Sequence, residues 1–125
     1  MNLISVRDDL ERLSALVEIL CGAASADEYV AAQEVVVVEA MLKQLLAVDE
    51  LPEGARPCIV KFERGSFDPR ASLVRLALET DDDAEALLAA VMAVIVADRF
   101  VDSGEFGFVA ELADLLGLPL PSQLI

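Results

Sequence analysis

Residues 97–105 read Ala97-Asp98-Arg99-Phe100-Val101-Asp102-Ser103-Gly104-Glu105, and this stretch decides the fold because the chain carries its pattern twice. The upstream copy is Ala26-Asp27-Glu28-Tyr29-Val30-Ala31-Ala32-Gln33-Glu34, and both copies follow the pattern Ala-Asp-x-aromatic-Val-x-x-x-Glu. The flanking residues align at the same offset, with Leu16 on Leu87, Val38 on Val109 and Leu45 on Leu116. Two copies are too few for a solenoid, so the repeat predicts a single pseudo-symmetric domain.

Apolar residues recur at helical spacing on both sides of each copy. The sequence Ser5-Val6-Arg7-Asp8 has the form of a capping box, which predicts that a first helix begins there and runs to about Ser25. A second helix is predicted over residues 31–48, although its run Val35–Val38 would favour a strand by propensity alone. The last helix is predicted over residues 103–116, where Gly117 can adopt the left-handed conformation that ends it.

The middle of the chain is broken by two prolines and a glycine between residues 49 and 57. Residues 58–64 then predict a short helix, with a strand as the alternative. Asp68-Pro69 is the start signal of a helix that ends near Glu79 and carries Leu73, Leu76 and Ala77 inward. Residues 80–83, Thr-Asp-Asp-Asp, predict a capped start for a helix over residues 84–97. The expected fold is all-α, a single domain over residues 1–125 of roughly five to seven helices built from two pseudo-symmetric helical hairpins.

The composition excludes several classes of function. A formal net charge of −14 argues against nucleic acid and anionic membranes as partners, and it would attract metal cations or a basic protein surface. The chain has no His, so it lacks the commonest general base and the usual nucleophile–His pairs, and we expect no enzyme activity. No apolar run reaches the ~20 residues of a membrane helix, and no secretory signal is visible, so a cytoplasmic location is expected. Cys21 lies in an apolar helical pattern and is predicted to be a core residue.

The doubled motif has two interpretations. Carboxylates are preferred ligands of Ca²⁺ and Mg²⁺, so Asp27, Glu34, Asp98 and Glu105 are candidates for one divalent-metal site if the hairpins bring them together. Alternatively, the acids fix turns and cap helices, and Asp102-Ser103-Gly104-Glu105 is itself a plausible capping box. That explanation fits Glu34 less well, because the equivalent first position is Ala31, which has no side-chain acceptor.

The doubled Ala-Asp…Glu pattern, the helix before each copy and the ending Glu111-Leu112-Ala113-Asp114-Leu115-Leu116-Gly117-Leu118 resemble the TerB-like family of tellurite resistance. The resemblance covers about residues 6–118, and it implies two pseudo-symmetric helical hairpins with Asp27, Glu34, Asp98 and Glu105 as metal-binding positions. The chain departs from the family where the motif has Gly directly after the Asp, since Glu28 and Arg99 stand there. Each turn is therefore expected to differ in shape from the family's, because Gly permits left-handed backbone conformations that other residues adopt reluctantly.

Three functions follow as hypotheses. The first is a cytoplasmic TerB-like domain, a metal-linked scaffold or stress-response component that works through protein contacts without catalysis. The second is a purely structural interaction module, or a homodimer, without metal; Phe62, Phe67, Phe106 and Phe108 would then mark an interface unless they pack in the core. The third is a carboxylate- and metal-dependent hydrolase, which would need a phosphate-binding residue, and only Arg99 is close to the acids in sequence.

Overall fold

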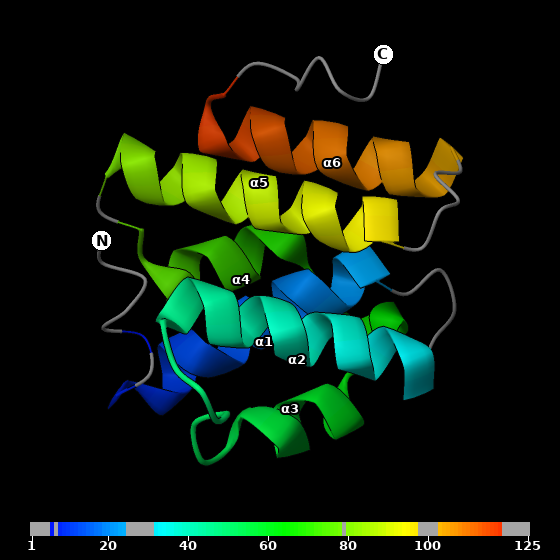
Figure 1. Cartoon of the computed structure of the whole chain (residues 1–125). Coiled ribbons are helices and arrows are strands. Elements are labelled where there is room, and N and C mark those ends of the chain that lie inside the picture. The colour runs from blue at the N-terminus through cyan, green and yellow to red at the C-terminus, as the bar shows by residue number, and fades with distance from the viewer. Residues whose placement is uncertain (1–5, 7, 25–31, 79, 98–102, 119–125) are drawn as a thin grey trace.

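The structure is a computed structural model that describes residues 6, 8–24, 32–78, 80–97 and 103–118. Six α-helices follow one another within these residues, with a short 3-10 turn between the third and fourth, and no strand occurs among them (Figure 1). The elements are α1 (Leu10–Ala24), α2 (Ala32–Leu46), α3 (Ala55–Lys61), η2 (Arg64–Ser66), α4 (Pro69–Leu76), α5 (Asp81–Ala97) and α6 (Ser103–Leu116). The predicted all-α class is confirmed.

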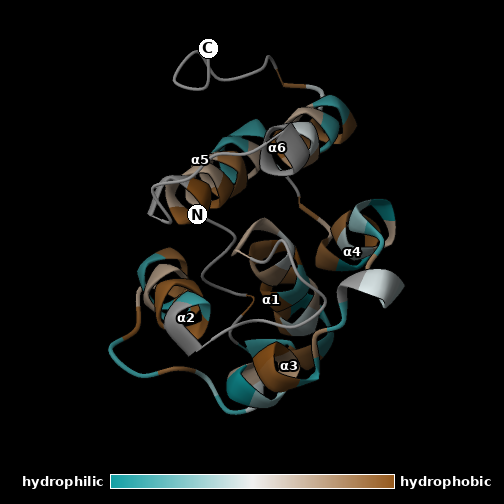
Figure 2. Cartoon of the chain, turned by 90° about the vertical axis from the view of Figure 1, so that its right-hand side faces the viewer, coloured by the Kyte–Doolittle hydropathy of each residue, from teal (hydrophilic) through white to brown (hydrophobic). Residues whose placement is uncertain are grey.

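Helix α1 is the central element of the fold. It contacts the other five helices, and in a view along the bundle it lies among α2, α3, α4 and α5 (Figure 2). From Leu13 to Ala24 every residue of α1 is buried except Ser14 and Glu18. A helix that is apolar on nearly all sides must be surrounded by other elements, which explains why the chain folds around its first helix.

The remaining helices pack around α1: α2, α5 and α6 form one group, and the short α3 and α4 form the other. Helices α2 and α5 contact each other as well as α1, and α6 packs mainly on α5. The sequence neighbours α1 and α2 are in contact, and so are α5 and α6, as expected for helices joined by short connections. The short helices α3 and α4 both pack on α1. Helix α3 lies on the side of α1 that is away from α5 and α6 (Figure 1).

The start of α1 differs from the prediction. The helix begins at Leu10 and Asp9 caps it, whereas Ser5 and Arg7 of the predicted capping box lie outside the described residues. The backbone amides of Glu11 and Arg12 donate to Asp9 Oδ1 at 3.2 and 3.3 Å. A carboxylate at this place satisfies amides that have no partner within the helix and interacts favourably with the helix dipole.

The valine run 35–38 is helical, as predicted from its flanks. Val38 is fully buried and Val36 is 66% exposed, so the run places one side chain in the core and another in solvent. In a strand, Val36 and Val38 would point to the same face, because side chains alternate from one residue to the next. Tertiary packing on α1 and α5 therefore outweighs the β-propensity of valine in α2.

Boundaries in the middle of the chain differ more from the sequence prediction. The helix expected over residues 58–64 is α3, Ala55–Lys61; it begins earlier because Gly54, at φ 95°, turns the chain directly into it. Helix α4 starts as predicted, with Asp68 accepting from the amide of Arg70 at 3.1 Å and Pro69 in the first turn. It ends at Leu76 and not near Glu79, and Ala77 is exposed and not inward-facing.

Helix α5 begins at Asp81, three residues before the predicted start, and Thr80 provides its cap. The Thr80 hydroxyl accepts from the amide of Asp83 at 3.2 Å. Asp81 and Asp82 are exposed in the first turn, whereas Asp83 is buried with 1% of its surface exposed. The triple Asp is thus part of a helix start, where negative charge is favourable.

Two helices end in the same hydrogen-bonding pattern. At the end of α6 the amides of Gly117 and Leu118 donate to the carbonyls of Asp114 and Ala113, and Gly117 has φ 72°, as predicted. At the end of α2 the amide of Val48 donates to the Lys43 carbonyl, and the left-handed residue is Ala47, φ 55°. This second ending has no glycine, so the sequence carries no signal for it.

Three phenylalanines, Phe62, Phe67 and Phe108, form an aromatic row in which Phe67 contacts the other two. The Phe67 ring lies 5.5 Å from the ring of Phe62 and 5.9 Å from that of Phe108, measured between centroids. Phe62 and Phe108 are buried and Phe67 is half-buried. Phe62 and Phe108 therefore belong to the core and Phe67 packs against it, while the side chain of Phe106 lies outside the described part of the chain. Among the described helices, none is both long and apolar enough to cross a lipid bilayer.

Candidate functional site

The doubled acidic motif falls mostly outside the described residues. Asp27 and Asp98 lie in the segments 25–31 and 98–102, which the structure does not describe, and the same holds for the side chain of Glu105 in the first turn of α6. Only Glu34, in the first turn of α2, has a described side chain, and it is half-buried. Whether the four carboxylates meet therefore stays a prediction.

The helix ends that flank the two copies lie at one end of the bundle. The C-terminal ends of α1 and α5 and the N-terminal ends of α2 and α6 all lie on the right-hand side in Figure 1. The first copy of the motif connects α1 to α2, and the second connects α5 to α6. Both copies are therefore bounded by helix ends that lie at the same end of the bundle.

Cys21 lies within electrostatic range of Glu34. Burial raises the pKa of the Cys21 thiol to about 12, and the negative charges of Cys58, Glu18 and Glu34 add to the shift. A thiol with this pKa is protonated at neutral pH, so it is neither a nucleophile nor a ready metal ligand. The prediction that Cys21 is a core residue is confirmed.

A network of polar side chains joins α1 to α4, and spacing along the chain does not predict it. Arg75 donates to both carboxylate oxygens of Glu18, from Nη1 at 2.8 and 3.1 Å. The hydroxyls of Ser14 and Ser72 also donate to Glu18, at 3.2 and 3.1 Å, and Arg75 Nη2 donates to the Ser14 hydroxyl. Ser14 and Glu18 are the two polar residues on the otherwise buried length of α1, which is the only signal the sequence carries for them.

The polar network between α1 and α4 has the features of a structural contact rather than those of a reactive site. Each Glu18 oxygen already accepts two hydrogen bonds, so the carboxylate is fully engaged. Ser72 is 1% exposed. Arg12 of α1 adds a further contact to α4, because its Nε donates to the Leu76 carbonyl at 2.8 Å. Together these bonds fix α4 on α1 despite the small size of α4.

We expect Glu18→Gln to lower the free energy of unfolding by about 1–2 kcal/mol at pH 7, because the neutral amide loses the charge-assisted bonds from Arg75. Urea denaturation followed by circular dichroism measures this change. The matched control is Glu39→Gln, which breaks the 2.7 Å pair with Arg56, whose side chain is 71% exposed. The control is expected to cost less than about 0.5 kcal/mol; equal losses in the two variants would contradict a structural role for the network.

A surface groove of about 390 Å³ opens beside this network, between α1, α3 and η2. Its walls include Glu18, the half-buried thiol of Cys58 and the exposed side chains of Lys61 and Glu63. Within the described ranges no three acidic or cysteine side chains gather closely enough to hold a metal ion, in this groove or elsewhere. The metal prediction therefore depends on the motif segments alone.

Comparison with known protein families, with curated proteins and with solved structures found no significant match to this chain.

Proposed function

We propose that the chain is a TerB-like domain, a non-catalytic, metal-linked scaffold or stress-response component that works through protein contacts. The observation that carries the proposal is that the helix ends flanking both copies of the acidic motif lie at one end of the bundle. Two connections of the same sequence pattern at the same end are what a shared site would need. The partner of such a domain is a protein, and the acidic surface favours a basic one.

Matched burial supports two related hairpins. Leu16 of α1 and Leu87 of α5 are aligned by the repeat, and both are fully buried. Val38 of α2 and Val109 of α6 are the next aligned pair, and both are also fully buried. In the third pair Leu45 is buried and Leu116 is half-buried, so this match is weaker. A pseudo-symmetric arrangement of α1–α2 and α5–α6 accounts for the agreement.

The donor set fits a hard divalent cation. Asp27, Glu34, Asp98 and Glu105 would all offer carboxylate oxygens, which Ca²⁺ and Mg²⁺ prefer. Four carboxylates held close together repel one another unless a cation or protons neutralise them. Glu34 already stands half-buried at the motif end, where such repulsion is poorly screened by water.

The proposal predicts a selective thermal shift. Metal-stripped protein titrated with Ca²⁺, Mg²⁺, Mn²⁺ or Zn²⁺ is expected to gain about 1.4 kcal/mol of stability when the preferred ion reaches about ten times its dissociation constant. Scanning fluorimetry measures this gain as a rise in melting temperature. Asp27→Asn and Asp98→Asn are each expected to remove the shift, since one site would use both copies.

One exposed acid beyond the C-terminal end of α2 provides the matched control. Asp49→Asn, at an exposed position after α2, is expected to leave the metal-dependent shift unchanged. Equal shifts with all four ions, or a shift that survives in both motif variants, would contradict the metal site. The acids of the motif would then serve as turn-fixing residues, and the domain would be an interaction module without metal.

A further inference from the structure

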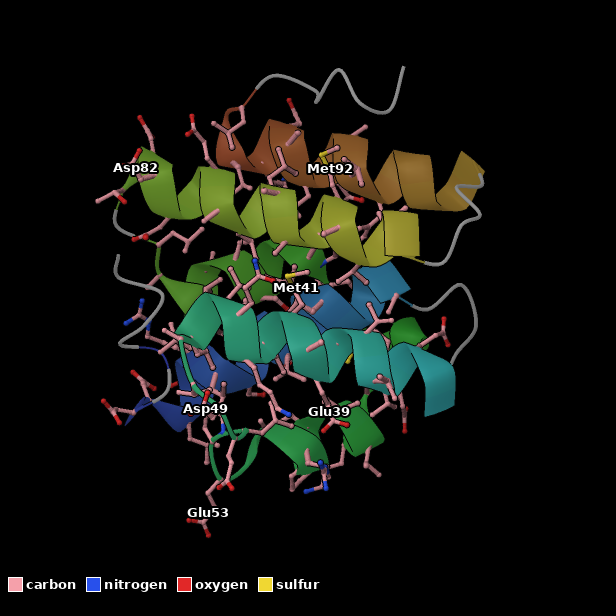
Figure 3. All side chains as sticks on the ribbon, in the orientation of Figure 1. Glu39, Met41, Asp49, Glu53, Asp82 and Met92 are labelled. Atoms are coloured by element: carbon pink, nitrogen blue, oxygen red, sulfur yellow. The ribbon has the colours of Figure 1, made fainter. Side chains whose placement is uncertain are left out.

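A second feature of the surface is a groove between α2 and α5. It has a volume of about 450 Å³, and both helices contribute to its lining. Uncharged side chains form its walls, including Met41, Gln44, Leu45, Ala86, Ala89 and Ala93. Met41 lies on the side of α2 that faces α5 (Figure 3). We call this depression the α2–α5 groove.

The α5 side of the groove is lined by alanines and carries no long side chain. Ala86, Ala89 and Ala93 follow one another at helical spacing, and Ala89 and Ala93 are exposed. Methyl groups on a helix surface allow the axis of another helix to approach closely, because no long side chain stands between the two backbones. On the α2 side, Met41 is half-buried and can adapt its shape to an inserted apolar side chain.

The charge around the groove selects the occupant. Asp82 stands one turn before Ala86 in the same row of α5, exposed at the N-terminal end of the helix (Figure 3). Glu85 is exposed in the next turn, and none of the residues that line the groove is basic. With a net charge of −14, a second copy of the chain would bring like charge to this end, whereas a basic segment would be attracted.

We propose that the α2–α5 groove binds an amphipathic basic helix of a partner protein. The row from Asp82 to Ala93 spans eleven helical steps, about 16 Å, which corresponds to about three turns of a bound helix. The apolar face of that helix fills the groove over Met41, Leu45 and the alanines, and its Lys or Arg residues lie at the end next to Asp82 and Glu85. This inference rests on the proposed function only in that the domain works through protein contacts.

A designed peptide tests the proposal directly. The probe is a synthetic amphipathic helix with leucines on one face and lysines at one end, and the control peptide carries Glu in place of each Lys. In an NMR titration the Lys peptide is expected to shift the amide signals of α2 and α5 and leave those of α3 and α4 unchanged. The Glu peptide is expected to bind at least about tenfold more weakly.

Variants of the protein locate the contact. Ala89→Arg fills the groove with a long, positively charged side chain and is expected to weaken binding of the Lys peptide by at least about tenfold, a change of 1.4 kcal/mol. Asp82→Asn is expected to weaken it by about threefold and to reduce its salt dependence. The matched control is Ala71→Arg, at an exposed alanine of α4 outside the groove, which is expected to leave the affinity unchanged. Circular dichroism checks that each variant remains folded.

Several outcomes would overturn the proposal. They are no binding at millimolar peptide, equal binding of the Lys and Glu peptides, and unchanged affinity in Ala89→Arg. Concentration-dependent self-association that Ala89→Arg abolishes would show that a second copy occupies the groove instead. The titration is run with metal-stripped and metal-supplemented protein. Binding under both conditions, together with no selective thermal shift, would retain the groove and reject the metal site.

Discussion

Leu16→Ala is expected to lower the free energy of unfolding by about 3–4 kcal/mol. Leu16 is fully buried at the middle of α1, the helix that contacts all the others. Truncation removes apolar contacts and leaves a cavity that the surrounding helices cannot fill, since five elements hold their positions around α1. A loss of this size is a large part of the total stability of a typical domain.

The repeat adds a second expectation. Leu87 occupies the aligned position on α5 and is equally buried, so Leu87→Ala is expected to cost about as much as Leu16→Ala. Leu10→Ala on α1 is the control, because Leu10 is 62% exposed and its truncation is expected to cost less than about 1 kcal/mol. Urea denaturation of the three variants measures all three values. A loss below about 1 kcal/mol for Leu87→Ala would contradict equivalent roles for the two positions.

The parts of the fold that the sequence predicts best are those with long periodic patterns. Helices α2 and α6 lie within two residues of their predicted limits, and Gly117 ends α6 as expected. The apolar residues on both sides of the valine run of α2 favour a helix over a strand. Periodicity over several turns averages out the propensity of single residues, which is why these predictions are reliable.

The ends of the other helices could not be predicted from local signals alone. Around the start of α1, Ser5, Asp8 and Asp9 are all good capping residues, and the structure selects Asp9. Two helices end at alanines in the left-handed conformation, Ala47 and Ala77, where sequence rules look for glycine. The identity of the terminal residue therefore does not predict these two ends.

The surface features depend on tertiary contacts that spacing cannot reveal. Glu18 and Arg75 lie 57 positions apart, so their pairing follows only from the packing of α4 on α1. The α2–α5 groove likewise exists only because α2 and α5 lie side by side, and the alanine spacing of α5 does not predict that contact. For the acidic motif the reverse holds: the sequence names the residues, and the structure describes only the side chain of Glu34 among them.

Gly22→Val is expected to destabilise the protein by about 2–3 kcal/mol, because Gly22 leaves the space in which the Phe67 ring packs on α1. A β-carbon at Gly22 would lie 2.5 Å from Phe67 Cε2 and 3.0 Å from Cζ, well inside van der Waals contact. The Phe67 ring contacts those of Phe62 and Phe108, so a displacement of the ring disturbs both contacts. The second γ-methyl of valine increases the overlap.

A glycine without such neighbours gives the control. No atom lies within 4 Å of a β-carbon added at Gly107 of α6, so Gly107→Val is expected to change stability by less than about 0.5 kcal/mol. Phe67→Ala removes the ring that the added side chain meets, and in this background Gly22→Val is expected to cost less than about 1 kcal/mol. A double-mutant cycle in urea then yields a coupling of about 2 kcal/mol between the two positions. Strictly additive losses would show that Gly22 is required for a reason other than the close approach of the Phe67 ring.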